Sequence, residues 1–179
     1  MLTVTLVNPV YNGAWWFLTT YILLVVLSVF INKIVKKYNA IVIAFISFII
    51  YFIAYIQRIK GILNFDNVIL EYIVRQLALL GTSLFPYIIG TIFAYKKIYS
   101  KLYTVVNKFK YKNIIIIALI SLMIVAHGIV QTLFVAVFTG IAFICLFNLL
   151  DKPQWINKLL LYLSSHSTNM WLIHMFLYS

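Results

Sequence analysis

Charged side chains are scarce in this chain: 9% of its 179 residues are charged, whereas 65% are hydrophobic and 17% aromatic. So few polar side chains cannot cover a surface that faces water, which excludes a soluble domain and predicts a membrane protein. Cysteine is nearly absent as well. The one copy, Cys145, can form no intramolecular disulfide and has no second cysteine with which to share a metal site. We interpret it as a small packed hydrophobe and predict no metal site and no bound cofactor.

Apolar runs of membrane-spanning length predict an all-α fold, a polytopic transmembrane helix bundle with about five full spans plus an incomplete sixth. The first run, 14–31, has eighteen uncharged residues. As a helix it rises about 27 Å and nearly crosses the hydrocarbon core of a bilayer. Further spans are expected at 40–56, 77–95, 114–126 (starting lower, near Tyr111) and 132–150. We expect a turn at 127–131, an interfacial segment at 155–163 and the incomplete sixth span at 169–179.

The third span contains Pro86, which removes a backbone donor and leaves a carbonyl one turn earlier without its helical partner. We therefore predict a break there, and an interior position where neighbouring protein satisfies that carbonyl. The polar segment before this span, 57–76, is expected to hold a short helix capped by Asp66. On that helix Glu71 precedes Arg75 by four residues, and we interpret them as an exposed pair. Contact with acceptor sugars is the functional alternative.

Basic residues are distributed unevenly along the chain. Eleven of the fourteen lie in the segments 33–37, 96–112 and 151–158, and the other three lie in 57–76. The positive-inside rule therefore predicts that the first three segments are cytoplasmic and that 57–76 and the N-terminus are outside. This placement accounts for the net charge of +11 without any nucleic acid.

The segment 96–112 interleaves six lysines with aromatic residues. Such interleaving can bind single-stranded nucleic acid. Between two membrane spans it favours an interfacial loop held to anionic lipid, at about 1 kcal/mol per basic residue near the surface. Attraction of a phosphorylated donor is the second interpretation. Membrane lipid is the predicted partner.

Both ends of the chain predict that it is part of something larger. Residues 1–12 carry no lysine or arginine and are not a signal peptide, and the charge rule places them outside with no span before them. A helix over 169–179 is about 16 Å long and ends in mid-bilayer. We expect residues 1–179 to form a single membrane domain that is a fragment of a larger one.

Four residues are candidates for a functional site. His174 is one because an ionisable side chain at membrane depth is costly unless paired, although a structural hydrogen bond to another helix is an equal alternative. Ser167 lies seven residues earlier on the same helix face. The two are about 10.5 Å apart along the axis, too far for a Ser–His dyad. Trp15 and Trp16 lie at a span end, where interfacial anchors are common.

These residues belong to two motifs that resemble signatures of the acyltransferase 3 family of polytopic membrane proteins. Gly13-Ala14-Trp15-Trp16-Phe17-Leu18 is similar to a Gly-x-x-Trp-Phe/Tyr-Leu signature in the middle of family members. The stretch from Ser167 to His174, Ser-Thr-Asn-Met-Trp-Leu-Ile-His, is similar to a pattern in their last spans. The resemblance covers most of this chain but about the C-terminal half of a family member. No segment matches the motif near the start of members that carries their catalytic histidine.

The resemblance implies an O-acyltransferase of a bacterial plasma membrane. Its donor would be a cytoplasmic thioester of acyl-CoA type, and its acceptor a hydroxyl of a cell-surface or exopolysaccharide sugar. His174 would support catalysis, while Trp15, Trp16 and Ser167 would contribute to substrate binding. The chain alone is expected to be inactive and to need a missing N-terminal half. The alternatives are a fragment of a lipid-linked sugar flippase or polysaccharide exporter, which the lack of internal repeats disfavours, and a membrane scaffold or decayed gene product.

Overall fold

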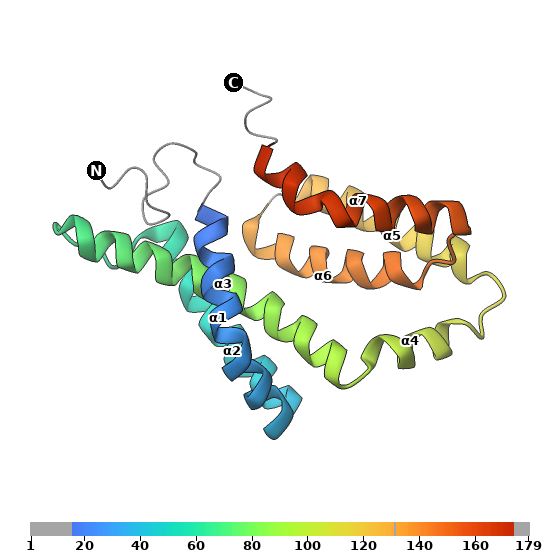
Figure 1. Ribbon diagram of the computed structural model, residues 1–179, viewed down its shortest axis with the longest axis horizontal. Helices are drawn as coiled ribbons and strands as arrows, with labels where there is room; N and C mark the ends of the chain where they lie inside the picture. Colours follow the sequence, from blue (N-terminus) through green and yellow to red (C-terminus); the bar gives the residue numbers. More distant parts are fainter. Residues whose placement is uncertain (1–15, 131, 174–179) are drawn as a thin grey trace.

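The computed structural model describes residues 16–130 and 132–173, and every regular element in these ranges is an α-helix. The all-α prediction is confirmed. Figure 1 shows α1–α3 as one group and α5–α7 as another, connected through α4. In chain order the helices are α1 Trp16–Lys37, α2 Ala40–Lys60, α3 Val68–Tyr95, α4 Ile98–Val106, α5 Lys112–Ile129, α6 Leu133–Leu149 and α7 Gln154–Ile173.

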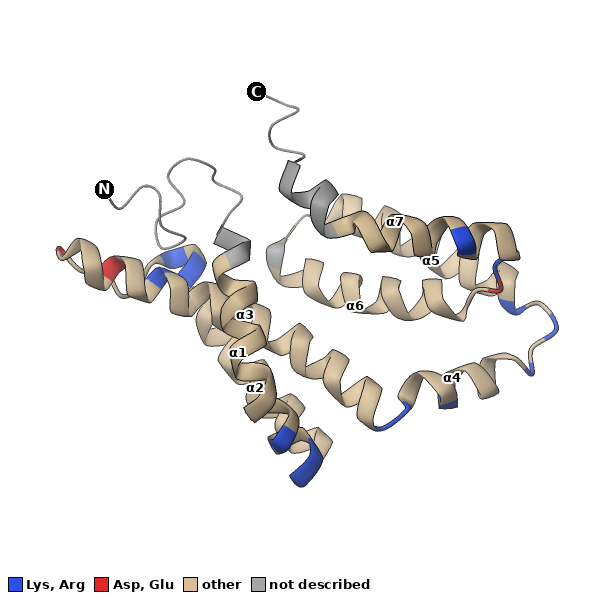
Figure 2. Ribbon diagram, viewed as in Figure 1, with Lys and Arg blue, Asp and Glu red and all other residues tan. Residues whose placement is uncertain are grey.

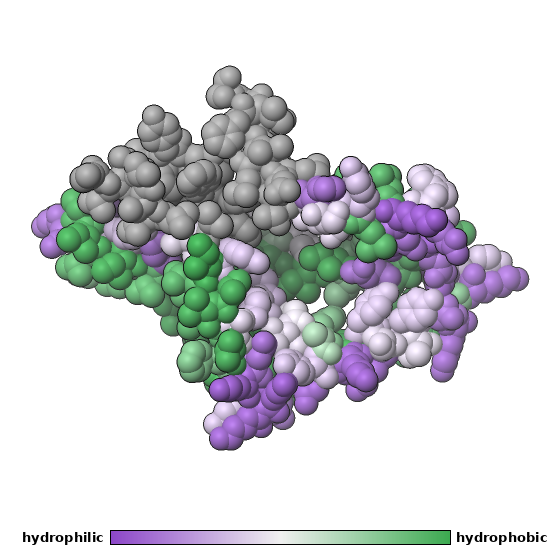
Figure 3. Space-filling view, in the orientation of Figure 1, coloured by the Kyte–Doolittle hydropathy of each residue, from purple (hydrophilic) through white to green (hydrophobic). Residues whose placement is uncertain are grey.

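Four helices are long and apolar enough to cross a membrane, namely α1, α2, α3 and α5. The apolar part of α6, Phe134–Leu149, is shorter and lies where the fifth span was expected. Large apolar side chains on these helices point outward: Val26 and Ile41 are 62% and 78% exposed. Figure 3 shows this apolar surface over α1 and α2, with polar residues toward the lower and right-hand margins. The chain is therefore an integral membrane protein.

The third span and the segment before it form one helix, which corrects two predictions. α3 begins at Val68, where a separate short helix was expected, and runs for 28 residues. Its N-cap is Asn67, not Asp66. The Asn67 side chain accepts hydrogen bonds from the backbone N–H groups of Ile69, at 2.9 Å, and Leu70, at 3.4 Å. No glycine or proline occurs from 68 to 80, so nothing in the sequence stops this helix before it enters the apolar span.

α3 also passes through Pro86 without interruption, contrary to the predicted break. Proline removes one helical hydrogen bond, but the helix is continuous across it, and Phe85 and Ile88 near it are buried. Of the four candidate spans α3 is the most buried, as the predicted interior position requires, while a partner for the freed carbonyl stays a prediction. A third of the apolar window of α3 (33%) is buried, compared with 6% in α5.

A tight turn joins α1 to α2 beside the lysines that end α1. Asn39 caps α2 by accepting a hydrogen bond from the N–H of Ile41 at 2.9 Å. Near this turn a buried cluster draws on three helices: Ile31, Val35, Ile43, Ile88 and Ile92. The ammonium of Lys36 lies 5.0 Å from the centroid of the Tyr95 ring, so the last turn of α1 lies beside the end of α3.

An aromatic cluster joins the two groups of helices. Phe48 and Tyr51 of α2, Phe85 of α3, and Phe134 and Phe138 of α6 have neighbouring ring centroids 5.4–6.4 Å apart. Tyr51 is 1% exposed, and its hydroxyl donates to the backbone carbonyl of Phe134 at 3.1 Å. Each aromatic pair contributes about 0.5–1.5 kcal/mol beyond its buried area. The cluster therefore holds α6 against α2 and α3.

Contacts connect the three lysine-bearing segments that the charge distribution assigns to one side. Besides the contact of Lys36 with α3, the Tyr99 hydroxyl of α4 donates to the carbonyl of Asn148 at the end of α6. Lys112 and Asp151 form an ion pair with an Nζ–Oδ2 distance of 2.6 Å. Figure 2 shows basic residues at the lower tip of α1, at the α3–α4 turn and along the α4–α5 connection. A separate group of mixed charge lies at the far end of α2 and α3. Which of the two sides is cytoplasmic stays a prediction.

Lys112 is the centre of the junction between α4, α5 and the turn before α7. Its side chain is 11% exposed, and its ammonium also donates to Asn107 Oδ1 at 2.5 Å and lies 5.0 Å from the centroid of the Tyr103 ring. Burial raises the pKa of the Tyr99 hydroxyl above its usual 10.0; Tyr103 and Asp151 act in the same direction, and Lys112 opposes them. The neutral hydroxyl is therefore the form that this junction favours.

Two further helices differ from the sequence predictions. α5 continues through His127 and Gly128 to Ile129, where a turn was expected, and the N–H of Val130 closes it on the carbonyl of Ala126. α7 is one helix across the expected interfacial segment and the start of the expected sixth span. Residues 154–173 contain no glycine or proline, so nothing in that stretch divides the helix.

Candidate functional site

The structure describes one of the four predicted site side chains. Trp15 and His174 lie outside the described residues, and Trp16 begins α1 with a side chain that is not described. Ser167 lies on α7, is exposed, and donates its hydroxyl to the carbonyl of Ser164 at 2.8 Å. That bond occupies the hydroxyl proton and leaves the oxygen able to accept. The predicted assembly of these four residues stays a prediction.

Two buried polar side-chain atoms have no hydrogen-bond partner within the part of the chain that the structure describes. They are Nδ1 of His127, in the last turn of α5, which donates or accepts according to the tautomer, and the acceptor Oε1 of Gln76, on α3. A buried polar atom without a hydrogen-bond partner costs about 1–3 kcal/mol, so each is a position where a partner would be stabilised. The buried hydroxyls of Ser47 and Thr82 differ from them. Each donates to a carbonyl three residues earlier in its own helix, at 2.9 and 3.0 Å.

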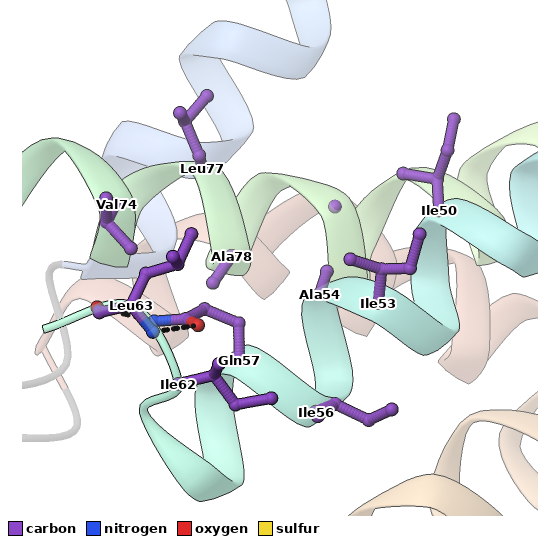
Figure 4. A pocket seen from close by; sticks show the side chains of 11 residues that line it. Ile50, Ile53, Ala54, Ile56, Gln57, Ile62, Leu63, Val74, Leu77 and Ala78 are labelled. Carbon is purple, nitrogen blue, oxygen red and sulfur yellow. Dashed lines mark hydrogen bonds between the residues drawn. The ribbon is translucent and has the colours of Figure 1, made fainter.

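A groove lies between α2 and α3. Its volume is about 600 Å³. That lies within the ~300–1,000 Å³ range of pockets that bury a small organic ligand. Figure 4 shows α2 and α3 crossing near Ala54 and separating toward Gln57 and Val74, with the chain after α2 returning over the space between them. The lining is almost entirely aliphatic: Ile50, Ile53, Ala54, Ile56, Ile62, Leu63, Val74, Leu77, Ala78 and Gly81, with Gln57 as the one polar side chain.

Close helix contact closes the inner end of this groove. A Cβ atom placed on Gly81 would lie 2.6 Å from the Cβ of Ala54 and 3.7 Å from Cγ2 of Ile50. Glycine is therefore needed there for α3 to approach α2 this closely, as small residues do in other membrane helix pairs. From that contact the helices diverge and leave the groove open between them.

A polar pocket of about 340 Å³ continues the groove at the end of the two helices. It shares Gln57, Leu63, Val74 and Ala78 with the apolar groove. Its remaining lining includes Arg58 and Arg75, the carboxylate of Glu71, the amide of Asn64, and Leu79. The predicted Glu71–Arg75 pair is not formed: both side chains line the pocket, but no N–O distance between them falls within 4.0 Å.

The chain that covers this pocket is held in place by Gln57. Its Nε2 donates to the carbonyl of Leu63 at 3.0 Å, and its Oε1 accepts from the N–H of Leu63 at 2.9 Å (Figure 4). Gly61 ends α2 in the left-handed conformation (φ 56°), and its N–H bonds the carbonyl of Gln57 at 2.9 Å. A residue with a Cβ rarely adopts this conformation. The rim of the pocket is therefore built by local hydrogen bonds and is formed before any ligand binds.

Sequence reasoning did not identify this groove. The charged residues of 57–76 were predicted to lie on an exposed connection between two spans, and not to line a pocket. The signal that was present is the pair of arginines that flank a glycine-containing turn at the end of two apolar helices. The close approach at Gly81 could not be read from the sequence.

Comparison with known proteins assigns the chain to a family. A family model described as an acyltransferase domain, that of acyltransferase 3, matches residues 2–179. No curated protein and no solved structure gives a significant match. The matched range contains both motifs on which the resemblance was based, and it covers nearly the whole chain. This integral membrane protein belongs to the acyltransferase 3 family.

Proposed function

We propose that this protein is a membrane O-acyltransferase that moves an acyl group from a cytoplasmic thioester donor of acyl-CoA type to a hydroxyl of a cell-surface or exopolysaccharide sugar. The observation that carries the proposal is the family match over residues 2–179. The basic residues at the end of α1, at the α3–α4 turn and along the α4–α5 connection (Figure 2) support it, because a phosphorylated donor is attracted to positive charge.

The proposed chemistry is acyl transfer between sulfur and oxygen. The sugar oxygen attacks the thioester carbonyl, the carbon–sulfur bond breaks, and the donor leaves as a thiol after a base has taken the hydroxyl proton. His174 is proposed to support this site, because a neutral imidazole can accept or orient a proton at membrane depth. Trp15, Trp16 and Ser167 are proposed to contribute to the substrate-binding side of the same site.

The proposed location is a bacterial plasma membrane, with the N-terminus outside and the segments 33–37, 96–112 and 151–158 in the cytoplasm. The positive-inside rule supports this orientation, since eleven of fourteen basic residues lie in those segments. It gives the reaction a donor side rich in lysine and an acceptor side at the α2–α3 turn.

The test is surface ester content in cells that express this chain together with an N-terminal half from the family and lack other acyltransferases of this type. His174→Ala is expected to abolish acylation while the protein's abundance in the membrane stays normal. His166→Ala is the matched control, because His166 lies on α7 and packs against the exposed ring of Tyr162, with centroids 4.8 Å apart. That variant should retain activity.

Two results would contradict the assignment of His174. Full acylation by His174→Ala would remove it from the site. Reduced abundance with His174→Ala, together with recovery of both abundance and activity in His174→Gln, would make it a structural hydrogen bonder. If neither the variants nor the wild-type chain, expressed together with an N-terminal half from the family, produced surface esters with any sugar acceptor, the proposed reaction itself would be wrong.

A further inference from the structure

We propose that the groove between α2 and α3 binds a single-chain lipid phosphate, with its hydrocarbon chain along the apolar part and its phosphate at Arg58 and Arg75. The inference goes beyond acyl transfer and does not depend on it. It rests on the depth of the groove, the change from apolar to charged lining along it, and the fixed form of its rim.

The depth of the groove corresponds to one leaflet of a bilayer. Glu71 lines the polar end and Gly81 the closed end, ten residues apart on α3. Ten helical residues rise about 15 Å. That is about half of a ~30 Å hydrocarbon core, so the groove reaches from the headgroup level to the middle of the membrane.

The inner part of the groove suits hydrocarbon and not a sugar. Among the described residues that line it, the side chains are aliphatic apart from Gln57, and both ends of the Gln57 amide are already bonded to the backbone of Leu63. A sugar placed there would lose its hydrogen bonds to water without replacement, at a cost of several kcal/mol. A hydrocarbon chain loses nothing, because it leaves an equally apolar bilayer.

The outer part supplies the selectivity that hydrocarbon cannot. Two guanidinium groups, Arg58 and Arg75, and one carboxylate, Glu71, line the polar pocket, so the described part of its lining carries one net positive charge. Arginine matches phosphate oxygens with paired donors, and the amide of Asn64 adds a further donor at the same pocket. Because the chain alone gains little affinity by entering the groove, the anionic head decides which lipid binds.

The groove is built in advance for one chain. Gly81 and Ala54 close it at one end, and the Gln57–Leu63 hydrogen bonds fix the turn over the other. Preformed walls avoid the cost of ordering a loop when the ligand binds. A lipid with two chains would leave its second chain outside the groove, so one chain is the better fit.

Photocrosslinking of the full chain in phosphatidylcholine vesicles tests the proposal. The probe is lysophosphatidic acid with a diazirine at the end of its chain, and peptide mass spectrometry locates the adducts. Adducts are expected on α2 and α3 between Ile50 and Gly81. Unlabelled farnesyl phosphate should displace the probe, whereas lysophosphatidylcholine of the same chain length and inorganic phosphate should not. Adducts spread evenly over the exposed apolar faces would overturn the proposal. Displacement of the probe by lysophosphatidylcholine or by inorganic phosphate would overturn it as well.

Three variants and two control variants test the parts of the site. A charge-assisted hydrogen bond is worth about 1.5–3 kcal/mol, so Arg58→Gln and Arg75→Gln should each weaken labelling about tenfold. Lys60→Gln is the control, because it removes a nearby charge that does not line the pocket. Val74→Trp should block the groove, whereas Val125→Trp, on an exposed face of α5, should not. Helical content by circular dichroism verifies that each variant is folded. Folded arginine variants that label like the wild type would refute the phosphate site, whatever the outcome of the acyltransferase assay.

Discussion

Replacing Gly81 by alanine is expected to push α2 and α3 apart at their point of closest approach. The new Cβ would lie 2.6 Å from the Cβ of Ala54. Carbon atoms are comfortable at about 3.5–4.0 Å, so the helices must separate by about 1 Å or shift past each other. Neither contact atom is the end of a flexible side chain, so the strain falls on the backbones. This is the most extensive helix contact in the described structure.

The expected magnitude combines two opposing effects. Overpacking of a well-packed contact costs about 1–3 kcal/mol. Alanine is also a better helix former than glycine by about 0.8–1 kcal/mol, which hides part of that cost. Gly90→Ala separates the two effects. Gly90 is on the same helix, and nothing lies within 4 Å of its added Cβ. Gly81→Ala should therefore be less stable than Gly90→Ala by about 1–3 kcal/mol.

The assay is unfolding of the purified chain in mixed micelles, with the fraction of dodecyl sulfate increased and helicity followed by circular dichroism. Ala54→Gly removes the opposing Cβ, so the double variant Ala54→Gly/Gly81→Ala should recover most of the loss. A coupling energy near zero between these two positions would refute the close contact. Equal stability of Gly81→Ala and Gly90→Ala would refute it as well.

Three further predictions concern the lysine-bearing side. Asp151→Asn should lower the free energy of unfolding by about 1 kcal/mol or less, since Lys112 loses its ion partner but Asp151 is half-exposed, and the loss should shrink in high salt. Burial raises the pKa of Tyr99 in the folded state. The contribution of the neutral Tyr99 to stability should therefore be fully present below pH 10.0, and this contribution should be lost as the pH rises through the raised pKa. Tyr99→Phe should remove that part of the alkaline loss of stability, and an unchanged pH profile would contradict it. In a cysteine-free background, an impermeant thiol reagent should label a cysteine at Lys60 and not at Lys101, and the reverse pattern would invert the proposed orientation.

Composition and local pattern determined the class of the protein and the ends of several helices. Hydrocarbon offers no hydrogen bonds, so a backbone that crosses it must satisfy itself as a helix, and long apolar runs therefore predict helices directly. The expected start of the fourth span near Tyr111 and of the fifth at Thr132 agrees with the N-caps of α5 and α6. The two motifs at Trp15–Trp16 and Ser167–His174 also pointed to the family that the comparison established.

Tertiary structure alone decided which faces of those helices meet. A helix that faces lipid is apolar on its outer side as well as its inner side, so periodicity does not reveal the buried face. The break predicted at Pro86 was wrong because the rule for proline is local. It does not include tertiary contacts such as the packing of Phe85 against neighbouring rings. The groove depends on the approach of Gly81 to Ala54, residues far apart in the chain, and on the divergence of α2 and α3 beyond that point. Arg58 and Arg75 were visible as charges in the sequence. Only the crossing of the two helices places them at the polar end of an apolar groove.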